Sequence, residues 1–488
     1  MKKLFVVITA AVIVGGLASC KKFLDREPLS YLPDNSTNDT IPLKTAADAE
    51  NAMSAVYSAM KNSQSELYML DYYVNGDAQS DNSYAGADNP ANFQIDEYHI
   101  DATNSNVSRD WAYYYGLISR TNNVIQNVPK ITDASLSATR KDEVIGEASF
   151  VRAFAYFDMV RLWGDVPLVT KEVPFISADN INDVYPILYP SRTPKAEVYA
   201  QIIADLETSI AKSPSAYGPT KFRGTKGAAH ALLAKVYATI EPHDWTKVNQ
   251  QCDAVLAGGY SLLTNYDWLW DNAHENSAEA IFEMDCTDWN TGGEWGVFMF
   301  AGTDWKKFNT PTNDLVKVFT AEGDSIRKHS SIVFADVTGA WTDRYWPASN
   351  YPFANKLRDF SGAQNQIFLR LADIILLKAE ALIELNDLTG AKNLINQVRT
   401  RVSLPNTPAN TQAELRLAVE KERRLELAFE GVRWYDLVRT GRAIPVMNAL
   451  KDGSGVSLGY NVTPNKLLWP IPQGERDKNN NLTQNPGY

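Results

Sequence analysis

Residues 420–442 read EKERRLELAFEGVRWYDLVRTGR, and this stretch decides the fold. Its apolar residues recur at three- and four-residue steps, which predicts one helix with a buried stripe: Leu425, Ala428, Phe429, Val432 and Tyr435. The charges between them are too interleaved with large aromatics for a plain solvated face, and Glu430 stands within ion-pair reach of Arg433. Gly431 costs a helix about 1 kcal/mol relative to Ala, so it indicates a close backbone approach or a break.

The order of residues in ERRLELAFEGVRWYDLVRTGR resembles the C-terminal signature of the SusD/RagB family, the surface nutrient-binding lipoproteins of Bacteroidetes. Three further blocks resemble the same family: CKKFLDREPLS from Cys20, GEASFVRAFAYFDMVRLWGDVPLVT from Gly146, and LLWPIPQGERDKNNNLTQNPGY at the end of the chain. The resemblance therefore touches both ends and the middle of the chain and covers nearly all of it.

The first 19 residues have the features of a lipoprotein signal peptide. Lys2 and Lys3 precede an apolar run over 4–17 that is too short to span a bilayer, which needs about 20 apolar residues. Leu17, Ala18, Ser19 and Cys20 resemble the bacterial lipobox, in which cleavage leaves an acylated cysteine at the new N-terminus. We therefore expect a membrane anchor at Cys20 and a polar, proline-containing tether over 20–44.

From residue 45 onward the chain shows mainly helical periodicity, with helices predicted over 146–170, 195–212, 225–240, 246–257, 366–385 and 389–402. The first of these is expected to stop at Gly164 and Pro167. Consecutive pairs of these resemble tetratricopeptide hairpins with irregular spacing. The predicted fold is all-α, an α/α superhelix of tetratricopeptide-like helix pairs. The predicted SusD-like domain spans 45–488, with a helical body over 45–257 and 364–488. Residues 71–100, rich in Asn, Asp and Gly, read instead as a long ordered loop.

An irregular insertion over 258–363 interrupts the helical pattern. It holds seven of the 12 tryptophans, with short strands such as 280–286 between Gly- and Asp-rich turns. Flat rings pack against the C–H faces of sugars, and neighbouring Asp and Asn side chains bind hydroxyls. The ligand-binding candidates are accordingly Asp77, Tyr84, Asn92, Trp289, Trp295, Trp305, Trp341 and Trp346.

Composition narrows the possible partners. The formal net charge of −11 argues against nucleic acid, whose phosphates require a cationic surface. Cys252 and Cys286 are both predicted to be small residues of the core. The sequence does not decide whether a disulfide joins them. The acidic stretch 267–279 has oxygen ligands of the kind that Ca²⁺ prefers, so the sequence does not decide whether a structural Ca²⁺ binds there. No other cofactor is expected.

The sequence matches known enzyme motifs only incompletely. Gly455, Ser457 and Gly459 fit G-x-S-x-G, but all five histidines lie upstream, whereas the hydrolase order requires one downstream. A glycosidase needs only two carboxylates, so a surface glycan hydrolase remains an alternative, as do a peptide-binding member of the family and a protein-binding scaffold. The resemblance implies no catalysis. It implies a cell-surface, lipid-anchored outer-membrane protein that binds oligo- or polysaccharides and delivers them to a SusC-like TonB-dependent transporter.

Overall fold

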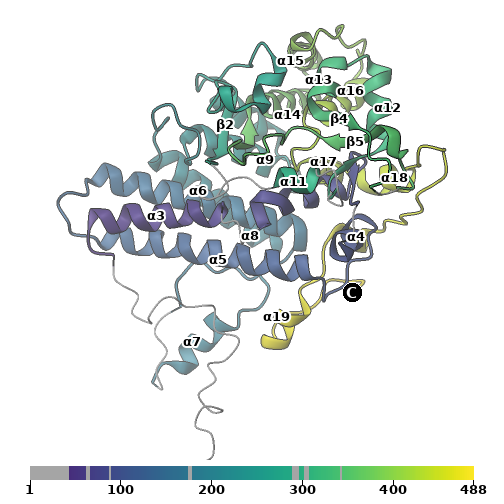
Figure 1. Ribbon diagram of the computed structural model, residues 1–488. Coiled ribbons are helices and arrows are strands. Elements are labelled where there is room, and N and C mark those ends of the chain that lie inside the picture. The colour runs from purple at the N-terminus through teal and green to yellow at the C-terminus, as the bar shows by residue number, and fades with distance from the viewer. Residues whose placement is uncertain are drawn as a thin grey trace, which may run out of the picture. The chain divides into compact units, whose positions relative to one another are not determined.

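A computed structural model describes residues 43–61, 66–86, 89–173, 179–287, 296–301, 307–340 and 343–488 (Figure 1). The predicted signal peptide, Cys20 and nearly all of the predicted tether lie outside the described residues. Among the helices of the described part, none is both long and apolar enough to cross a membrane.

α-Helices dominate the described chain, which confirms the prediction of an all-α fold. The helices of the body are α3 (Ala46–Met60), α5 (Ser105–Asn127), α6 (Ala138–Trp163), α8 (Lys195–Lys212), α9 (Lys226–Tyr237), α10 (Trp245–Leu256), α14 (Leu371–Glu384), α15 (Leu388–Arg401) and α16 (Gln412–Glu426). From α5 onward each packs against the next, and α3 lies against α5 and α6 (Figure 1). The series is the expected tetratricopeptide-like stack of helix pairs.

Side-chain caps explain why these helices start where they do. Thr45 and Thr411 each form a capping box, with Asp48 and Glu414 respectively, so two otherwise unsatisfied backbone groups are bonded at each helix start. Gly164 ends α6 at φ 73°, a conformation that glycine adopts without steric cost.

The end of α6 receives the C-terminal segment of the chain. Trp163 packs edge-on against Trp469 at 5.6 Å, and its indole N–H donates to the Pro470 carbonyl over 3.1 Å. Asn485 donates to the carbonyls of Trp163 and Trp469. Trp469 therefore attaches the C-terminal segment to the helical body, whereas Tyr488 is exposed and only donates to the Leu468 carbonyl.

The prediction of a single helix over 420–442 is wrong. α16 ends at Glu426, a turn follows with Phe429 and Gly431 at positive φ, and α17 (Arg433–Arg439) begins in a new direction. The break separates Glu430 from Arg433, so the ion pair expected between them does not form. Arg433 instead pairs with Asp81 and Glu420.

Both alternatives raised by Gly431 occur together. The helix breaks there, and the backbone also approaches that of Gly76. A Cβ on Gly76 would lie 2.0 Å from the Gly431 carbonyl oxygen, and one on Gly431 would lie 2.6 Å from the Tyr72 ring. Only glycine fits at these two positions, because any side chain would displace backbone atoms.

Residues 71–100 are also not the predicted loop. Two π-helical turns (Leu67–Asp71 and Val74–Ala78) lead to strand β1 (Ser83–Tyr84) and helix α4 (Pro90–Asp96). Most side chains of the segment are buried, including many polar ones. The sequence lacked a helical stripe because the segment is covered on nearly every side rather than on one.

The insertion contains helices α11 (Gly296–Phe300), α12 (Asn313–Glu322) and α13 (Ser325–Ser331). Three two-stranded antiparallel sheets accompany them: β1 with β3 (Thr310–Pro311), β2 (Ala280–Met284) with β6 (Gln366–Arg370), and β4 (Ile332–Ala335) with β5 (Tyr351–Ala354). The helix expected over 366–385 is thus a strand for its first five residues. Its pairing with β2 ties the insertion to α14.

The shorter elements include α7 (Ile181–Leu188), α18 (Ala443–Asn448), α19 (Gln473–Lys478) and a 3₁₀ turn at Tyr266–Trp270. Cys252 and Cys286 are buried as predicted, and no disulfide joins them.

Candidate functional site

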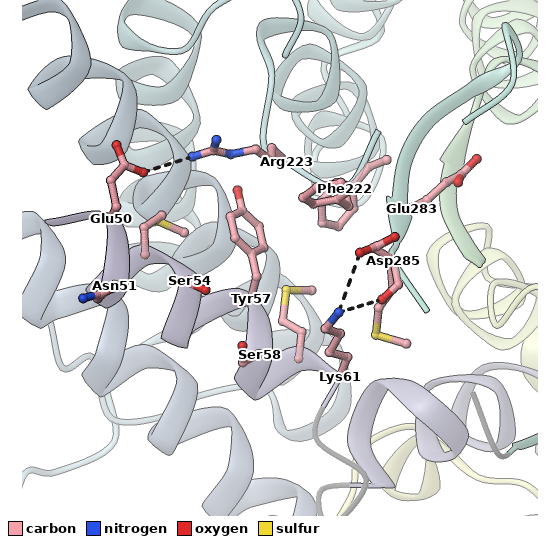
Figure 2. A pocket seen from close by; sticks show the side chains of 14 residues that line it. Glu50, Asn51, Ser54, Tyr57, Ser58, Lys61, Phe222, Arg223, Glu283 and Asp285 are labelled. Carbon is pink, nitrogen blue, oxygen red and sulfur yellow. Dashed lines mark hydrogen bonds and ion pairs between the residues drawn. The ribbon is translucent and has the colours of Figure 1, made fainter. Parts of the chain in front are cut away.

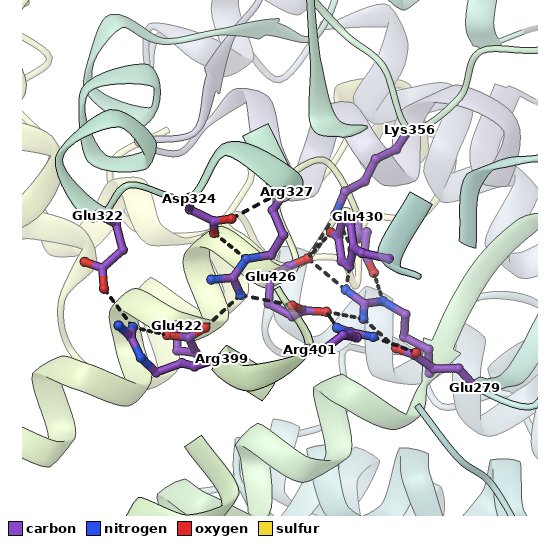
Figure 3. A network of polar contacts seen from close by, with 12 residues as sticks. Glu279, Glu322, Asp324, Arg327, Lys356, Arg399, Arg401, Glu422, Glu426 and Glu430 are labelled. Atoms are coloured by element: carbon purple, nitrogen blue, oxygen red, sulfur yellow. Dashed lines mark hydrogen bonds and ion pairs between the residues drawn. The ribbon is translucent and has the colours of Figure 1, made fainter. Parts of the chain in front are cut away.

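An ionic cluster surrounds the C-terminal turn of α16 (Figure 3). We define it by its members: Glu279, Glu322, Asp324, Arg327, Lys356, Arg370, Arg399, Arg401, Glu422, Glu426 and Glu430. Arg370 is its centre, with nitrogens 2.6 Å from Glu426, 2.7 Å from Glu430 and 3.0 Å from Glu279. The four-residue spacing of Glu422 and Glu426 places them on one side of α16, where they face arginines from three other segments, α13, β6 and α15.

The cluster is largely buried, and each of its charged groups forms an ion pair with at least one group of opposite charge. Burial by itself raises the pKa of Glu426, but Arg401, Arg370 and Arg327 together bring this pKa below its ordinary value. Burial lowers the pKa of Lys356 to about 8, although Glu430 lies 2.5 Å away. Because these charges are already paired within the fold, the ionic cluster positions the insertion against the helical body.

Asp77 is a core residue. Its side chain is 0% exposed and accepts a hydrogen bond of 2.7 Å from the Gly431 backbone N–H, beside the close approach to Gly76. Burial raises its pKa to about 8. A rim position around a ligand requires solvent exposure, which Asp77 lacks.

Asn92 and Tyr84 are similarly covered. Asn92 is 1% exposed and accepts from the Asn106 amide over 2.6 Å. Tyr84 is buried, and its hydroxyl donates to Asp343 over 2.8 Å. Its ring lies 4.3 Å from that of Tyr345, so Tyr84 supports a more exposed aromatic residue instead of forming the surface itself.

That surface, the 343–346 patch, consists of Asp343, Arg344, Tyr345 and Trp346. Trp346 is half-buried, and its indole N–H donates to the Pro311 carbonyl over 2.9 Å. The Arg344 guanidinium lies 4.6 Å from the Tyr345 ring centre. Asp343 accepts from both Tyr84 and Tyr351 over 2.8 Å. These bonds fix two adjacent, partly exposed rings on β1 and β3.

Trp289, Trp295, Trp305 and Trp341 lie outside the described residues. Trp346 is the one predicted tryptophan that the structure describes. The described residues that flank 302–306 are linked to each other, because the Phe308 N–H donates to the Met299 carbonyl over 2.8 Å. Gly86 likewise donates to Lys307, whose ammonium lies 3.8 Å from Asp343. The flanks of this stretch therefore connect to the 343–346 patch.

A cleft of about 430 Å³ opens between α3 and β2 (Figure 2). This size falls in the range of small-ligand sites. Its floor is apolar, formed by Met53, Met60, Phe222, Phe282 and Met284. Sequence reasoning missed it, since Met53 and Met60 belong to the core stripe of a helix and nothing in the sequence brings β2 beside them.

Polar groups surround this floor. Asn51, Ser54 and Ser58 are exposed and recur along one face of α3. Lys61 donates to the Asp285 carbonyl over 3.0 Å. Figure 2 shows Arg223 on the far side of Tyr57 from Lys61, so the two cations flank the aromatic ring.

A buried carboxylate fixes that end of the cleft. Glu147 accepts from Arg223 over 2.7 Å and from the Tyr57 hydroxyl over 2.9 Å. Glu283 on the opposite wall is also buried, which raises its pKa to about 7. The arrangement suits a ligand with an apolar face and a polar edge.

The described part of the chain shows no group of three His, Cys, Asp or Glu side chains suited to hold a metal. In the stretch where Ca²⁺ was considered, Asp267 pairs with Arg358, and Glu279 pairs with Arg370 and Arg401. The G-x-S-x-G stretch is an exposed turn in which the Ser457 hydroxyl accepts from the Gly459 N–H. The strand–turn–helix context of a hydrolase nucleophile is not found there.

Comparison with known proteins matches the two ends of the chain to related family models. Residues 298–488 match the model described as "SusD family", and residues 22–238 match the model described as "Starch-binding associating with outer membrane". The chain is also 26% identical to SusD-like protein P38 of Formosa agariphila, over 100% of this chain and 99% of that protein. The chain belongs to the SusD/RagB family.

Solved SusD-like structures share the fold. A SusD superfamily protein from Bacteroides vulgatus superimposes with a TM-score of 0.76 at 23% identity, covering 91% of this chain and 99% of that one. A structure named as a laminarin-binding SusD-like protein gives 0.74 at 26% identity, covering 91% of this chain and all of that one. The resemblance inferred from the sequence motifs is thereby confirmed.

Proposed function

We propose that the protein is a lipid-anchored surface protein that binds glycan oligomers and delivers them to a SusC-like TonB-dependent transporter. The observation that carries this proposal is the likeness along 91% of the chain to a SusD-like structure named for laminarin binding. The transporter and the anchor at Cys20 come from the family resemblance and the lipobox-like sequence.

The proposed ligand surface is the 343–346 patch together with Trp289, Trp295, Trp305 and Trp341. Tyr345 and Trp346 offer ring faces held by hydrogen bonds to neighbouring elements, so little conformational entropy is lost on binding. Arg344, whose side chain is largely exposed, supplies donors for hydroxyl groups. Each ring adds little affinity, but many copies on one cell surface binding one polymer multiply the effect.

The cleft between α3 and β2 is the second proposed contact. A sugar ring has an apolar C–H face and a hydroxyl edge, which match the Met and Phe floor and the row of Asn51, Ser54 and Ser58. The same floor also favours the peptide-binding alternative, because flexible methionine side chains adapt to apolar residues of different shape.

A glycan array with the folded chain, followed by calorimetry on the strongest ligand, tests this function. Ser54→Trp would fill the cleft from an exposed position on α3, whereas Ala55→Trp places the same bulk at an exposed position of that helix that does not line the cleft. We expect glycan binding by the parent chain, weaker binding by Ser54→Trp and unchanged binding by Ala55→Trp; equal binding by the two variants would exclude the cleft as a contact.

The competing classes have different readouts. Release of reducing ends from a bound glycan would make the protein a hydrolase. Binding to a peptide library but to no glycan would establish the peptide alternative, and binding to neither would leave a protein-binding scaffold.

The proposed anchor has its own test. Cys20→Ala should give a folded protein that no longer sediments with outer membranes. Sedimentation in the absence of the transporter would refute the anchor.

A further inference from the structure

Helix α7 presents apolar side chains to solvent. Its residues Ile181, Val184, Tyr185 and Leu188 recur at three- and four-residue steps and form one stripe. Val184 is buried, but Ile181 is 40% and Tyr185 54% exposed. In Figure 1 the helix lies apart from the helical body, on the side of α5. Exposed apolar side chains on one stripe of a helix indicate a surface that another molecule covers.

The attachment point of α7 coincides with the point where the described chain begins. Glu172, in the segment that leads towards α7, accepts from Asn123 over 2.7 Å and from Asn127 over 2.9 Å at the end of α5. Just beyond that end, Asp133 accepts from the Ala46 N–H at the start of α3 over 2.9 Å. The segment before α7 and the first described residues are therefore fixed at the same end of the helical body.

The proposed anchor tethers this end of the helical body to a membrane. The chain between Cys20 and Leu43 contains 22 residues. Any chain of that length spans at most about 75 Å, so Leu43 stays within that distance of the lipid. Weak insertion by a nearby helix then becomes effective, since the anchor makes it an intramolecular event.

We propose that α7 lies in the outer face of the membrane to which Cys20 is anchored, with Ile181 and Tyr185 inserted among the lipids. The inference rests on the proposed lipid anchor. The rings of Tyr185 and Tyr189 lie 4.8 Å apart. Tyrosine is enriched at membrane–water interfaces. Residues 179–190 contain no Lys or Arg, and their charged residues are Asp179 and Asp183, so attraction to anionic lipids contributes nothing and the contact is hydrophobic.

The size of the helix favours lipid over protein. A stable protein interface buries at least about 1,000 Å² in total, more than one face of an eight-residue helix supplies. A lipid surface imposes no such requirement, because insertion of a few apolar side chains adds to an anchor that already holds the protein.

Hydrogen exchange on the full-length lipidated protein tests the proposal without any substitution in α7. The protein is reconstituted on phosphatidylcholine vesicles and compared with Cys20→Ala in solution. Amide exchange across residues 181–189 should slow by about fivefold or more on vesicles. It should stay slow when salt is raised and when the vesicles contain phosphatidylglycerol.

Two variants complete the design. Ile181→Asp combined with Tyr185→Asp should abolish the protection while the protein stays vesicle-bound through its lipid. Leu417→Asp, which places the same charge at an exposed apolar position of α16, should leave it intact.

Each other outcome overturns the inference in a recognisable way. If the wild-type protein floats with vesicles but α7 exchanges as fast as in solution, this inference alone fails. Protection that arises only when the transporter is added would make α7 a protein-binding surface instead. A wild-type chain that does not float at all refutes the anchor, and the inference with it.

Discussion

The ionic cluster and helix α7 have opposite relations between residue type and environment. Around α16 charged side chains are buried and paired with one another, whereas in α7 large apolar side chains face solvent. Residue type alone would have placed the charged side chains around α16 at the surface and the apolar side chains of α7 in the core. The comparison shows that the family-like signature at 420–442 mainly holds the fold together. Surfaces available for partners occur where apolar or aromatic groups remain uncovered.

Removing the central arginine should give the largest effect. Arg370→Ala leaves Glu279, Glu426 and Glu430 without their shared partner in a buried site, at a cost of about 3–5 kcal/mol. Arg416→Ala removes an arginine that is 48% exposed and paired with Glu384, which should cost less than about 1 kcal/mol. Urea unfolding midpoints measure both. Equal midpoints would mean that burial adds nothing to the ion pairs.

The close approach at Gly431 can be separated from its backbone conformation. Gly431 and Gly441 have nearly the same φ, 71° and 68°, but of the two only Gly431 has other atoms within contact distance of the Cβ that an alanine would add. Gly431→Ala should therefore cost about 1–3 kcal/mol more than Gly441→Ala. Thermal unfolding of the two variants gives the difference, and a difference near zero would show that Tyr72 can move aside.

Asp77 should make stability depend on pH. Its pKa of about 8 in the folded protein exceeds the value of about 3.9 in an unfolded chain, so folding takes up a proton between these values. Its contribution is complete below pH 4 and is lost as pH rises towards 8, at no more than about 1.4 kcal/mol per pH unit. Asp77→Asn should flatten that decline in the free energy of unfolding. An unchanged slope would assign the decline to another buried carboxyl with a raised pKa, such as Glu283, whose pKa burial raises to about 7.

The smallest expected effect concerns the 343–346 patch. Trp346→Ala should weaken glycan binding by roughly 2- to 12-fold, the equivalent of about 0.5–1.5 kcal/mol for one ring. Trp268 provides a matched control, because it is exposed but stacks on His274 elsewhere in the insertion. Trp268→Ala should bind normally. If calorimetry instead showed the loss with Trp268→Ala alone, the ligand surface would lie there.

Sequence periodicity predicted the long helices well. The bounds of α8 agree with prediction at both ends, and Gly164 ends α6 as expected, because capping and apolar spacing are local properties. The break after Glu426 depended on Gly76, which lies far away in the sequence. Strand β6 was read as helix because its partner β2 lies about 85 residues earlier in the chain.

The candidate site was less predictable for the same reason. Asp77 and Asn92 looked exposed because polar residues usually are, but their partners Gly431 and Asn106 bury them. Trp346 was recognisable from aromatic density. Its hydrogen bond to Pro311, and the packing of Tyr84 against the neighbouring Tyr345, depend on the pairing of β1 with β3. The cleft needed α3 and β2 side by side, which no local pattern encodes.

The packing of Trp163 against Trp469 bears on how the protein matures. On the proposed export route the chain would emerge N-terminus first, so α6 would cross the inner membrane about 300 residues before the segment that covers Trp163. Until then the Trp163 indole would pack only against rings of α5 such as Trp111, and its other side would be accessible to periplasmic chaperones. We expect a chain truncated before Trp469 to be retained by them and degraded, as pulse-chase secretion would show. A stable truncated product would mean that the N-terminal helices close their own core. The segment around Trp469 would thus report, during the proposed export, that the helical body before it has been followed by the segment that covers it.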